Sequence, residues 1–484
     1  MNTPALCATI TADSMDQLRA RRDAVRAADL VELRLDGVRD PDVAGALQGR
    51  HLPVIVTCRA GWEGGRFEGS EEERRRLLEQ ALREGADWVD LEWRGGFETL
   101  VESRRGRNIV LSSHDFEGVP TDLDERYRAM RATGAHVVKL AVTPDTGDAL
   151  RQLRRLGTDD DEPRVLIGMG QLGVPSRVLP ARFGSAWTYA GDGVAPGQIS
   201  VTRLLERYRF RSITETTPIY GVAGSPIGHS LSPAMHNAGL AALDRDAVYV
   251  PVEAADADDL RRLAEDLSVV GLSVTAPFKE GVLGFADTRD PLVQRVGAAN
   301  TLRRVGDGWE ARNTDVAGFL APLAAYGRLA GRRATVLGAG GAARGVAVGL
   351  SDQGARVSVC ARRVERAREV AAVVGGDAVP FPPEAGSWDL LVNTTPIGTA
   401  PHGDESPVPA TCLTGGRLVY DLIYNPDPTR LMRDARAAGC ETIGGLDMLV
   451  AQALDQFEWW FGERPSAEVF RAAATEELSQ EKPE

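Results

Sequence analysis

The chain contains almost no lysine. Lysine and arginine together number 56, yet only Lys139, Lys279 and Lys482 are lysines, so arginine carries nearly every positive charge. Arginine stays protonated near neutral pH, whereas a lysine can lose its proton and act as a nucleophile or base. We therefore interpret Lys139, within the apolar stretch 136–142, and Lys279 as two chemical centres.

Other absences narrow the class of protein. The five cysteines are scattered without a C-x-x-C pair, which fits reduced thiols in a cytoplasm and gives no metal site. No apolar run approaches 18 residues and the first residues show no signal peptide, so neither a membrane span nor secretion is predicted. A net charge of −13 argues against nucleic acid or an anionic membrane as the main partner. We expect a cytoplasmic protein that acts on small molecules. The sequence gives no indication of its oligomeric state.

At 484 residues the chain is long enough for two or more domains. In its first half, eight short apolar stretches alternate with helical patterns, at 7–12, 30–36, 53–59, 88–93, 108–115, 136–142, 164–170 and 186–191. Eight strand and helix units within about 200 residues predict a (β/α)8 TIM barrel. A doubly wound sheet is the rival fold, but this half has no Gly-rich phosphate loop.

Polar residues recur near the ends of these predicted strands. Residues two apart on a strand point to the same side, and TIM barrels place their chemistry at the carboxyl ends of the strands. We therefore expect one mouth that gathers Glu32 with Arg34, Thr57 with Arg59, Asp90 with Glu92, Ser112 with His114, and also Lys139, Arg177 and Gln198.

The residue types in this set indicate Schiff-base chemistry. A lysine in apolar walls is expected to have a lowered pKa, so that its neutral amine can attack a ketone. A histidine can move the proton that the resulting iminium acidifies, and arginines can bind a carboxylate. The set suits either a class I aldolase or a Schiff-base dehydratase acting on a small carboxylated keto acid.

The first half also resembles type I 3-dehydroquinate dehydratase, in the motifs VELR (31–34), TCR and EGG (57–65), SSHDF (112–116), VVKLAV (137–142), MGQLGVPSR (169–177), FGSAWTYA (183–190) and APGQ (195–198). The resemblance implies that Lys139 forms the Schiff base and that His114, oriented by Glu92, is the acid/base of a syn dehydration. It implies substrate binding by Thr9, Glu32, Arg34, Arg59, Arg177 and Gln198. Val194 stands where many members have a serine, which removes one hydrogen bond to the substrate.

The second half begins after a polar stretch at 211–218, which we interpret as a linker. Ser232 followed by Pro233 predicts the start of a helix, with Ser232 as its N-cap. A later strand presents Lys279, and the hairpin and segment after it contribute Asn300 and Asp315. A lysine, a carboxylate and polar donors at strand ends suit proton exchange with an alcohol or ketone oxygen.

A dinucleotide-binding fingerprint follows. The pattern G-x-G-x-x-A at 338–343 lies between a predicted strand and an apolar helix, as such a site requires. The next predicted strand leads to Arg362, Arg363 and Arg366, where an NAD enzyme would carry Asp or Glu, so NADP is favoured. Ordinary surface arginines are the alternative interpretation.

Residues from about 219 to 470 resemble shikimate dehydrogenase, in the motifs GSPIGHSLSPAMHN, GLSVTAPFK, GAANTL, NTDVAGF, VLGAGGAARGVA, NTTPIGT, YDLIYNP and GLDMLVAQA. The resemblance implies hydride transfer between NADPH and 3-dehydroshikimate, with Lys279 and Asp315 as the acid/base pair. The implied shikimate ligands are Ser230, Ser232, Thr275, Asn300, Tyr424 and Gln452. The implied cofactor cleft comprises Gly338, Ala339, Gly340, Gly341, Ala342, Arg362, Thr394, Leu422 and Gly445. Ala361 and Arg363 replace the asparagine and threonine usual beside that arginine.

The sequence thus predicts an α/β protein in which an N-terminal (β/α)8 TIM barrel precedes a two-lobed shikimate dehydrogenase-like module with a Rossmann NADP-binding domain. The predicted parts are the barrel (1–210), a linker (211–218), a shikimate-binding lobe (219–327), the Rossmann lobe (328–444), C-terminal helices returning to the substrate lobe (445–474) and a disordered tail (475–484). We expect consecutive steps of the shikimate pathway, from 3-dehydroquinate through 3-dehydroshikimate to shikimate. One alternative is a quinate preference in the dehydrogenase half. Another is a catalytically dead sensor, which predicts loss of Lys139, His114, Lys279 or Asp315, and all four are present.

Overall fold

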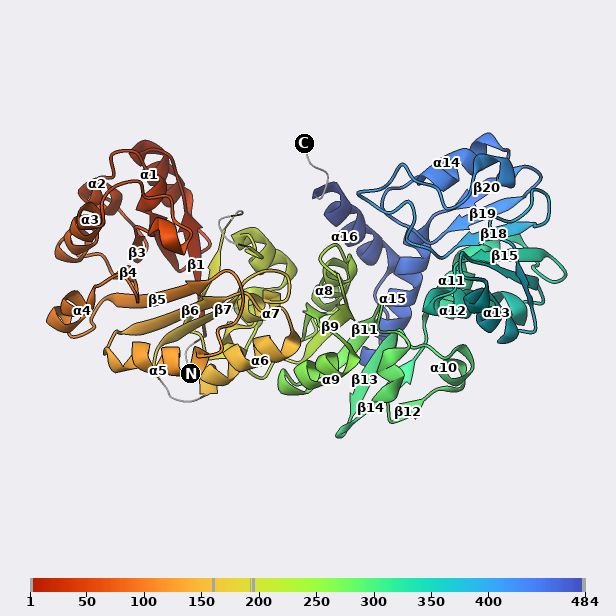
Figure 1. Ribbon diagram of the computed structural model, residues 1–484, viewed down its shortest axis with the longest axis horizontal. Helices are drawn as coiled ribbons and strands as arrows, with labels where there is room; N and C mark the ends of the chain where they lie inside the picture. The colour runs from red at the N-terminus through yellow and green to blue at the C-terminus, as the bar shows by residue number, and fades with distance from the viewer. Residues whose placement is uncertain (1–2, 159–161, 192, 194–195, 481–484) are drawn as a thin grey trace. The chain divides into compact units, whose positions relative to one another are not determined.

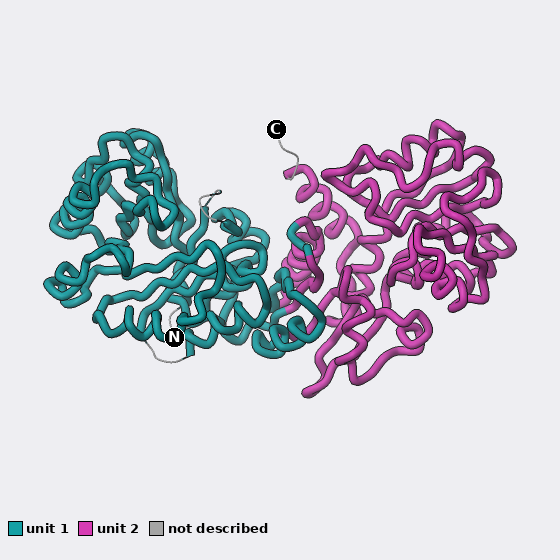
Figure 2. Tube along the Cα trace, in the orientation of Figure 1, with its two compact units in different colours: residues 1–219, 226–228, 246–268 teal, residues 220–225, 229–245, 269–484 magenta. Residues whose placement is uncertain are grey.

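The computed structural model describes residues 3–158, 162–191, 193 and 196–480. They form two compact units (Figure 2), unit 1 with residues 1–219, 226–228 and 246–268, and unit 2 with residues 220–225, 229–245 and 269–484. Within the described part of the chain, no helix combines the length and the apolar character needed to cross a membrane.

Eight parallel strands form the centre of unit 1 (Figure 1): β1 (Ala5–Ile10), β2 (Leu30–Arg34), β3 (Val54–Thr57), β4 (Trp88–Glu92), β5 (Ile109–Asp115), β6 (Val137–Val142), β7 (Arg164–Gly168) and β8 (Trp187–Ala190). Their order is β7-β6-β5-β4-β3-β2-β1-β8. At the two ends of this order, the backbone N–H of Ala186 donates to the carbonyl of Arg164 over 2.8 Å. This near-closed barrel confirms the predicted fold of the first half.

Helices alternate with the barrel strands: α1 (Met15–Ala24), α2 (Val43–Leu47), α3 (Glu71–Arg83), α4 (Glu98–Arg104), α5 (Leu123–Ala132), α6 (Gly147–Arg155) and α7 (Val174–Val178). Short helical turns lie between or after them: η1 (Leu35–Gly37), η2 (Gly61–Glu63), η3 (Leu156–Thr158), η4 (Pro180–Phe183), η5 (Arg203–Arg207) and η6 (Phe210–Ser212). Helix α3 begins with a capping box, in which Ser70 accepts from the N–H of Glu73 and Glu73 accepts from the N–H of Ser70.

The register of β6 explains how a lysine enters the barrel core. Val137 and Ala141 belong to a buried apolar cluster, and Lys139 lies between them at the same side-chain period of two. Lys139 is paired in register with Ser112 of β5 and with Val165 of β7. The strand pattern therefore turns the Lys139 side chain toward the same side as the apolar core.

Unit 1 also contains β10 (Val248–Glu253) and α9 (Ala257–Asp266), which belong to the predicted shikimate-binding lobe (219–327). Helix α9 contacts α6 through hydrogen bonds and an ion pair. The Asp259 carboxylate accepts from the backbone N–H groups of Gly147 and Asp148 at 2.7 and 2.8 Å, and Arg154 pairs with Asp266. The free N–H groups at the start of α6 thus receive an acceptor from a segment that follows about a hundred residues later.

Unit 2 contains strands of two six-stranded sheets. The first, of order β10-β9-β11-β13-β14-β12, includes β9 (Ile219–Gly224), β11 (Val269–Val274), β12 (Thr288–Arg289), β13 (Thr301–Val305) and β14 (Gly308–Arg312). The second, of order β17-β16-β15-β18-β19-β20, is parallel and comprises β15 (Arg333–Leu337), β16 (Arg356–Cys360), β17 (Asp377–Val379), β18 (Leu390–Asn393), β19 (Leu418–Asp421) and β20 (Glu441–Ile443). That second order is the one expected for a Rossmann domain.

The helices of unit 2 are α8 (Ser232–Ala242), α10 (Pro291–Val296), α11 (Asp315–Leu323), α12 (Gly341–Asp352), α13 (Val364–Ala372), α14 (Arg430–Ala437), α15 (Gly445–Phe461) and α16 (Ala467–Gln480), with the turns η7 (Gly281–Gly284), η8 (Ala324–Tyr326) and η9 (Ala410–Leu413). Among its buried residues, Phe319 of α11 stacks on Tyr420 of β19 with ring centroids 5.1 Å apart. This contact fixes α11, and with it Asp315 at its start, against the Rossmann sheet.

Two helix ends differ from the predictions. The N-cap of α8 is Leu231, and Ser232 is the first helical residue, because the Ser230 hydroxyl already accepts from the N–H of Ser232. Helix α16 continues to Gln480 beyond the predicted start of disorder at 475, because Ala474 and Glu477 are buried. Residues 481–484 of that tail lie outside the described residues.

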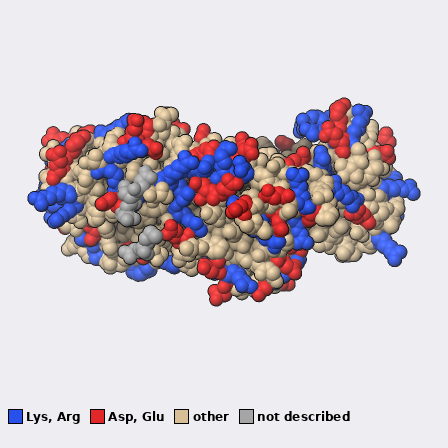
Figure 3. All heavy atoms as spheres, turned by 90° about the horizontal axis from the view of Figure 1, so that it is seen from below, with Lys and Arg blue, Asp and Glu red and all other residues tan. Residues whose placement is uncertain are grey.

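Positive and negative side chains are interspersed on the face drawn in Figure 3. Many exposed arginines pair with nearby acids, as Arg295 does with Asp352 and Arg333 with Asp389. Such exposed pairs contribute little to stability. Arginine therefore serves here as the ordinary surface cation, which makes the buried lysine more distinctive.

Candidate active sites

The barrel holds a cavity of about 90 Å³ at the carboxyl ends of its strands. Its lining includes eight residues that the sequence placed at the site: Thr9, Glu32, Arg34, Arg59, His114, Lys139, Arg177 and Gln198. Glu63, Phe116 and Tyr189 line it as well. Val194, the position of the missing serine, lies outside the described residues.

Lys139 has charged neighbours in addition to the apolar walls that the sequence suggested, which include Ala141, Ile167 and Met169. Its Nζ atom lies 3.1 Å from the Asp90 carboxylate and 3.9 Å from that of Glu32. The same atom lies 4.1 Å from the centre of the Tyr189 ring. The strand period that turns Lys139 inward also turns these acids inward, so its Nζ atom has carboxylate partners.

His114 is held by Glu63, not by Glu92. The Nδ1 atom of His114 lies 2.8 Å from a carboxylate oxygen of Glu63, which belongs to the turn η2. Burial lowers the pKa of His114 well below its usual value, and the nearby charges of Arg59 and Lys139 lower it further. Burial also raises the pKa of Glu63 to about 7. A neutral imidazole fixed through Nδ1 can accept a proton at Nε2.

Glu92 has a different role from the one predicted. It is fully buried, and its carboxylate accepts from Arg59 at 3.1 Å, from Arg74 and from the backbone N–H of Ala60 at 3.1 Å. Two guanidinium groups therefore compete successfully for the carboxylate that was expected to orient His114. The prediction of Glu92 as the orienting residue is wrong.

The three arginines of the cavity differ in their partners. Arg59 donates to Asp90, Glu92 and Ser112, so both of its terminal nitrogens are occupied. Arg34 forms two hydrogen bonds with Asp36.

Arg177 has no carboxylate partner among the described residues. It is 2% exposed, donates to the carbonyl of Pro196 at 3.1 Å, and has a pKa that burial lowers to about 10. A buried cation without a counter-ion is expensive, so this position favours an anionic ligand.

A second set of polar side chains meets in unit 2. Lys279, after β11, donates to the Asp315 carboxylate over 2.6 Å, and the Asn300 amide donates to the other oxygen of Asp315 at 2.8 Å. The Asn300 amide also lies 3.2 Å from the carbonyl oxygen of Gln452 on α15. The structure therefore brings together four residues that the sequence predicted, from segments far apart along the chain.

The remaining predicted shikimate ligands lie on neighbouring segments. The N–H of Thr275 donates to the carbonyl of Ala223 at the end of β9, and the N–H of Ser225 donates to the carbonyl of Ala276. These bonds join the loop that carries Ser230 and Ser232 to the turn that carries Thr275 and Lys279. Tyr424 follows β19, on the Rossmann side of unit 2.

The predicted cofactor residues form a close-packed rim at the carboxyl ends of β15, β18 and β19. Gly338 has a φ of +112°, and a Cβ atom there would lie 2.5 Å from the Thr394 hydroxyl. A Cβ at Gly445 would lie 2.1 Å from the carbonyl oxygen of Leu422. Both positions therefore need glycine.

The rim leaves room where a dinucleotide would need it. A Cβ at Gly340 would meet no atom within 4 Å, and α12 starts at Gly341 without a side-chain cap on its first N–H groups. Arg362 and Arg363 are exposed just beyond β16. Free N–H groups at a helix start and arginines at the next strand end fit the pyrophosphate and the 2′-phosphate of NADP.

Comparison with known proteins agrees with this geometry. Residues 6–215 match the family model for type I 3-dehydroquinase. Residues 222–302 match the shikimate dehydrogenase substrate binding domain, and residues 445–475 match the shikimate 5'-dehydrogenase C-terminal domain. The chloroplastic bifunctional 3-dehydroquinate dehydratase/shikimate dehydrogenase of Arabidopsis thaliana is 34% identical, over 95% of this chain and 82% of its own. The chain belongs to this bifunctional family.

Single-function relatives match the second half of this family member. The shikimate dehydrogenase (NADP(+)) of Halorubrum lacusprofundi is 42% identical, over 54% of this chain and 99% of its own. A crystal structure of Thermus thermophilus shikimate 5-dehydrogenase with NADP(H) and shikimate is 36% identical, with a TM-score of 0.50, and covers 54% of this chain and 99% of its own.

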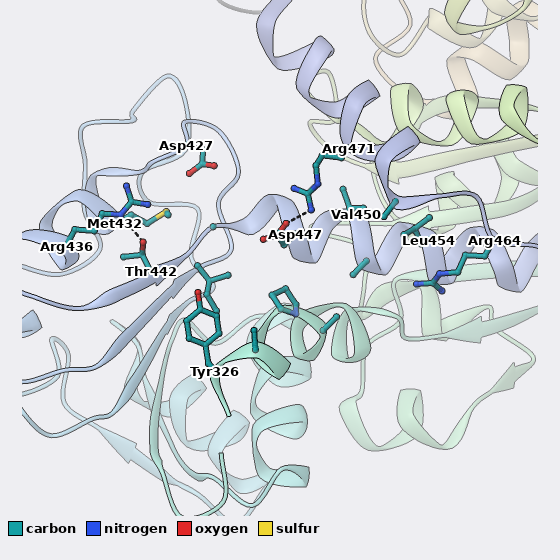
Figure 4. A pocket seen from close by; sticks show the side chains of 17 residues that line it. Tyr326, Asp427, Met432, Arg436, Thr442, Asp447, Val450, Leu454, Arg464 and Arg471 are labelled. Atoms are coloured by element: carbon teal, nitrogen blue, oxygen red, sulfur yellow. Dashed lines mark hydrogen bonds and ion pairs between the residues drawn. The ribbon is translucent and has the colours of Figure 1, made fainter. Parts of the chain in front are cut away.

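Unit 2 has a further cavity of about 540 Å³ that contains none of the predicted site residues (Figure 4). Its labelled lining side chains include Tyr326, Met432 and Arg436, together with Val450 and Leu454 of α15. Arg471 pairs with Asp447 at its edge. Large size alone therefore does not identify the reactive site in this unit.

The different contacts of Glu63 and Glu92 predict different effects of removing each charge. Glu63→Gln should lower kcat of dehydration on the order of 100-fold, because an amide no longer holds His114 in the required tautomer. Glu92→Gln should instead lower the free energy of unfolding of the barrel by about 3–5 kcal/mol, because it leaves buried arginines short of negative charge.

Steady-state kinetics and chemical denaturation of both variants test this pair of expectations. Oxidation of NADPH with added 3-dehydroshikimate serves as an internal control for protein quality. A loss of kcat in Glu92→Gln at unchanged stability, with full activity in Glu63→Gln, would contradict the assignment.

Proposed function

We propose that the chain catalyses two consecutive reactions, the dehydration of 3-dehydroquinate to 3-dehydroshikimate and the reduction of 3-dehydroshikimate to shikimate with NADPH. The observation that carries the proposal is the match to a bifunctional relative over 95% of the chain. One lysine centre lies in each half of that match, at Lys139 and Lys279. The relatives that match the second half are named shikimate dehydrogenases, which does not support the quinate alternative.

In the proposed dehydration, the neutral amine of Lys139 attacks the ketone carbon to give a carbinolamine, which takes up one proton and loses water to form an iminium; that proton is returned when the iminium is later hydrolysed. The iminium draws electrons from the adjacent carbon, and His114 takes a proton from that carbon. His114 then gives the proton to the departing hydroxyl, which leaves as a second water. Addition of water to the iminium releases 3-dehydroshikimate and restores Lys139. The lowered pKa of His114 and its hydrogen bond to Glu63 support this role.

The substrate carboxylate is proposed to bind Arg177. The support is that Arg177 is buried and has no carboxylate partner among the described residues, so a carboxylate ligand would supply the missing charge. We assign Thr9, Glu32, Arg34 and Gln198 to the substrate hydroxyls, since all of them line the same cavity. Arg59 is proposed to act chiefly by fixing Asp90 and Glu92.

In the proposed reduction, Lys279 gives a proton to the carbonyl oxygen of 3-dehydroshikimate, and Asp315 holds Lys279 in place. NADPH supplies the hydride to the carbonyl carbon. The Asn300 amide donates to Asp315 and to the side-chain oxygen of Gln452, and both Asn300 and Gln452 are proposed to bind shikimate hydroxyls. Ser230, Ser232, Thr275 and Tyr424 are proposed as further ligands. A side chain at Gly341 would lie 3.3 Å from the Cβ of Lys279, which supports a short path between cofactor and acid.

We propose the following catalytic parts: a barrel near 1–210, a linker at 211–218, a shikimate-binding lobe near 219–327, a Rossmann lobe near 328–444 and returning helices from 445. The family-model matches to 6–215, 222–302 and 445–475 support these limits. We also propose a cytoplasmic location, since all five cysteines are free thiols and four of them are buried.

Borohydride with 3-dehydroquinate should produce a covalent adduct on Lys139, because the reagent reduces an iminium to a stable amine. Lys139→Ala should abolish dehydration while NADPH oxidation with added 3-dehydroshikimate continues. Peptide mass spectrometry and the two separate activity assays measure these outcomes. An unmodified Lys139, or loss of both activities in the variant, would refute the two-centre model.

Arg362→Ala should raise KM for NADPH by about 10- to 100-fold, because one charge-assisted hydrogen bond to the 2′-phosphate is lost. KM for NADH should stay unchanged, since NADH lacks that phosphate. Arg366→Ala is the matched control, because Arg366 already pairs with Glu369 at 2.9 Å. Equal increases of KM for both nucleotides would contradict the assignment of Arg362 to the 2′-phosphate.

A further inference from the structure

Asp90 contacts the Lys139 amine, yet neither the proposed mechanism nor the family resemblance gives it a role. It lies on β4 and is fully buried. Its carboxylate accepts from Lys139 at 3.1 Å, from Arg59 at 2.8 Å and from Ser112 at 2.6 Å. Ser112 of β5, Lys139 of β6 and Arg59, which follows β3, thus all donate to Asp90. Asp90 itself does not line the cavity.

The other groups near Lys139 are less well placed to balance its charge. Glu32 of β2 lies 3.9 Å from Nζ and already accepts from the hydroxyls of Thr9 and Thr57. Glu32 also lines the cavity, where a substrate would compete for it, whereas Asp90 is not part of the cavity lining. The remaining titratable neighbours are Cys7 of β1, His114 of β5 and Tyr189 of β8.

Building on the proposed Schiff base, we propose that Asp90 is the positioning residue and counter-ion that keeps the Lys139 imine in its protonated, reactive form. The nitrogen of the iminium is the former Nζ of Lys139, so its N–H lies beside the Asp90 carboxylate. An adjacent anion favours the cationic iminium over the neutral imine. Only the cation withdraws enough electron density to acidify the neighbouring C–H.

Asp90 remains an anion throughout this cycle. Burial alone would raise its pKa, but the charges of Arg59 and Lys139 outweigh burial and hold the pKa of Asp90 well below the usual carboxyl range. Asp90 is therefore a poor base, and it does not remove the proton that it helps to retain. This separates its role from that of His114, which takes and returns a proton.

The test is Asp90→Asn in the full chain, which keeps the shape of the side chain and removes its charge. In the pH profile of kcat for dehydration, the alkaline limb should move at least one pH unit lower, because the iminium loses its proton more easily without the adjacent anion. The value of kcat near neutral pH should fall about 10- to 100-fold. KM for 3-dehydroquinate should change less than threefold, because Asp90 does not line the cavity. Borohydride trapping of Lys139 should lose rate over the same lowered pH range.

Ser112→Ala is the matched control. It removes a neutral donor to Asp90 and Arg59 but keeps the carboxylate, so the alkaline limb should stay where it is in the unmodified protein. Asp90→Glu, which retains the charge, should also keep that limb. An unshifted limb in a folded Asp90→Asn protein would overturn the proposal, and so would an equal shift in Ser112→Ala.

A measurement on the unmodified protein covers the case in which Asp90→Asn does not fold. With only three lysines in the chain, ¹⁵Nζ-lysine labelling gives few signals to assign. With substrate and product at equilibrium, the iminium nitrogen of Lys139 should remain protonated above pH 9, and a neutral imine at that pH would overturn the proposal. If borohydride traps no adduct even in the unmodified protein, the proposed Schiff base itself fails.

Discussion

Charge balance inside the barrel is the constraint on which the first site depends. Lys139, Arg59 and Arg74 are buried, and a buried charge is tolerated only where an opposite charge and hydrogen bonds compensate it. Asp90, Glu92 and Glu32 supply that compensation from adjacent strands. Asp90 and Glu92 are thereby committed to buried cations, whereas Glu63 bonds His114 at 2.8 Å and lies 3.5 Å from Arg59.

The two lysine centres use the same pairing in different surroundings. The Lys139 side chain is 6% exposed and shares Asp90 with Arg59, whereas the Lys279 side chain is 19% exposed and has Asp315 at 2.6 Å. A shared, buried acid suits a nitrogen that becomes part of a cationic intermediate. A closer pair at a more open position suits transfer of a single proton to a substrate oxygen. The scarcity of lysine elsewhere in the chain fits both roles, since arginine cannot perform either one.

Much of the fold and most of each site could be predicted from the sequence, because both follow local patterns. The period of two along the strands located the inward polar residues, and the Gly-rich turn located the Rossmann sheet. Glu63 escaped that pattern because it lies on a turn after β3, where no strand period applies. The EGG motif was the available signal: Gly64 has a φ of +75°, and a Cβ at Gly65 would lie 1.9 Å from the carbonyl oxygen of Arg59. Two glycines that form a tight turn directly after an acidic residue indicate that the turn fixes the position of that residue's carboxylate.

Two other features depend on long-range contacts that no local pattern contains. Glu92 was expected to orient His114, but Arg74 of α3 captures its carboxylate. Helix α9 lies within the predicted shikimate-binding lobe, in agreement with the family-model match to residues 222–302, but its contact with α6 through Asp259 has no signal in the local sequence. Tertiary packing decides which of several possible partners binds a given carboxylate. The sequence pattern could therefore identify the charged residues of the site, but not which of them pair with one another.

The central claim is that one chain carries both reactions, and it can be tested by supplying the purified chain with 3-dehydroquinate and NADPH alone. We predict that shikimate forms and that NADPH is consumed in equal amount, with 3-dehydroshikimate as the intermediate. Dehydration without NADPH consumption, or direct reduction of 3-dehydroquinate to quinate, would contradict it.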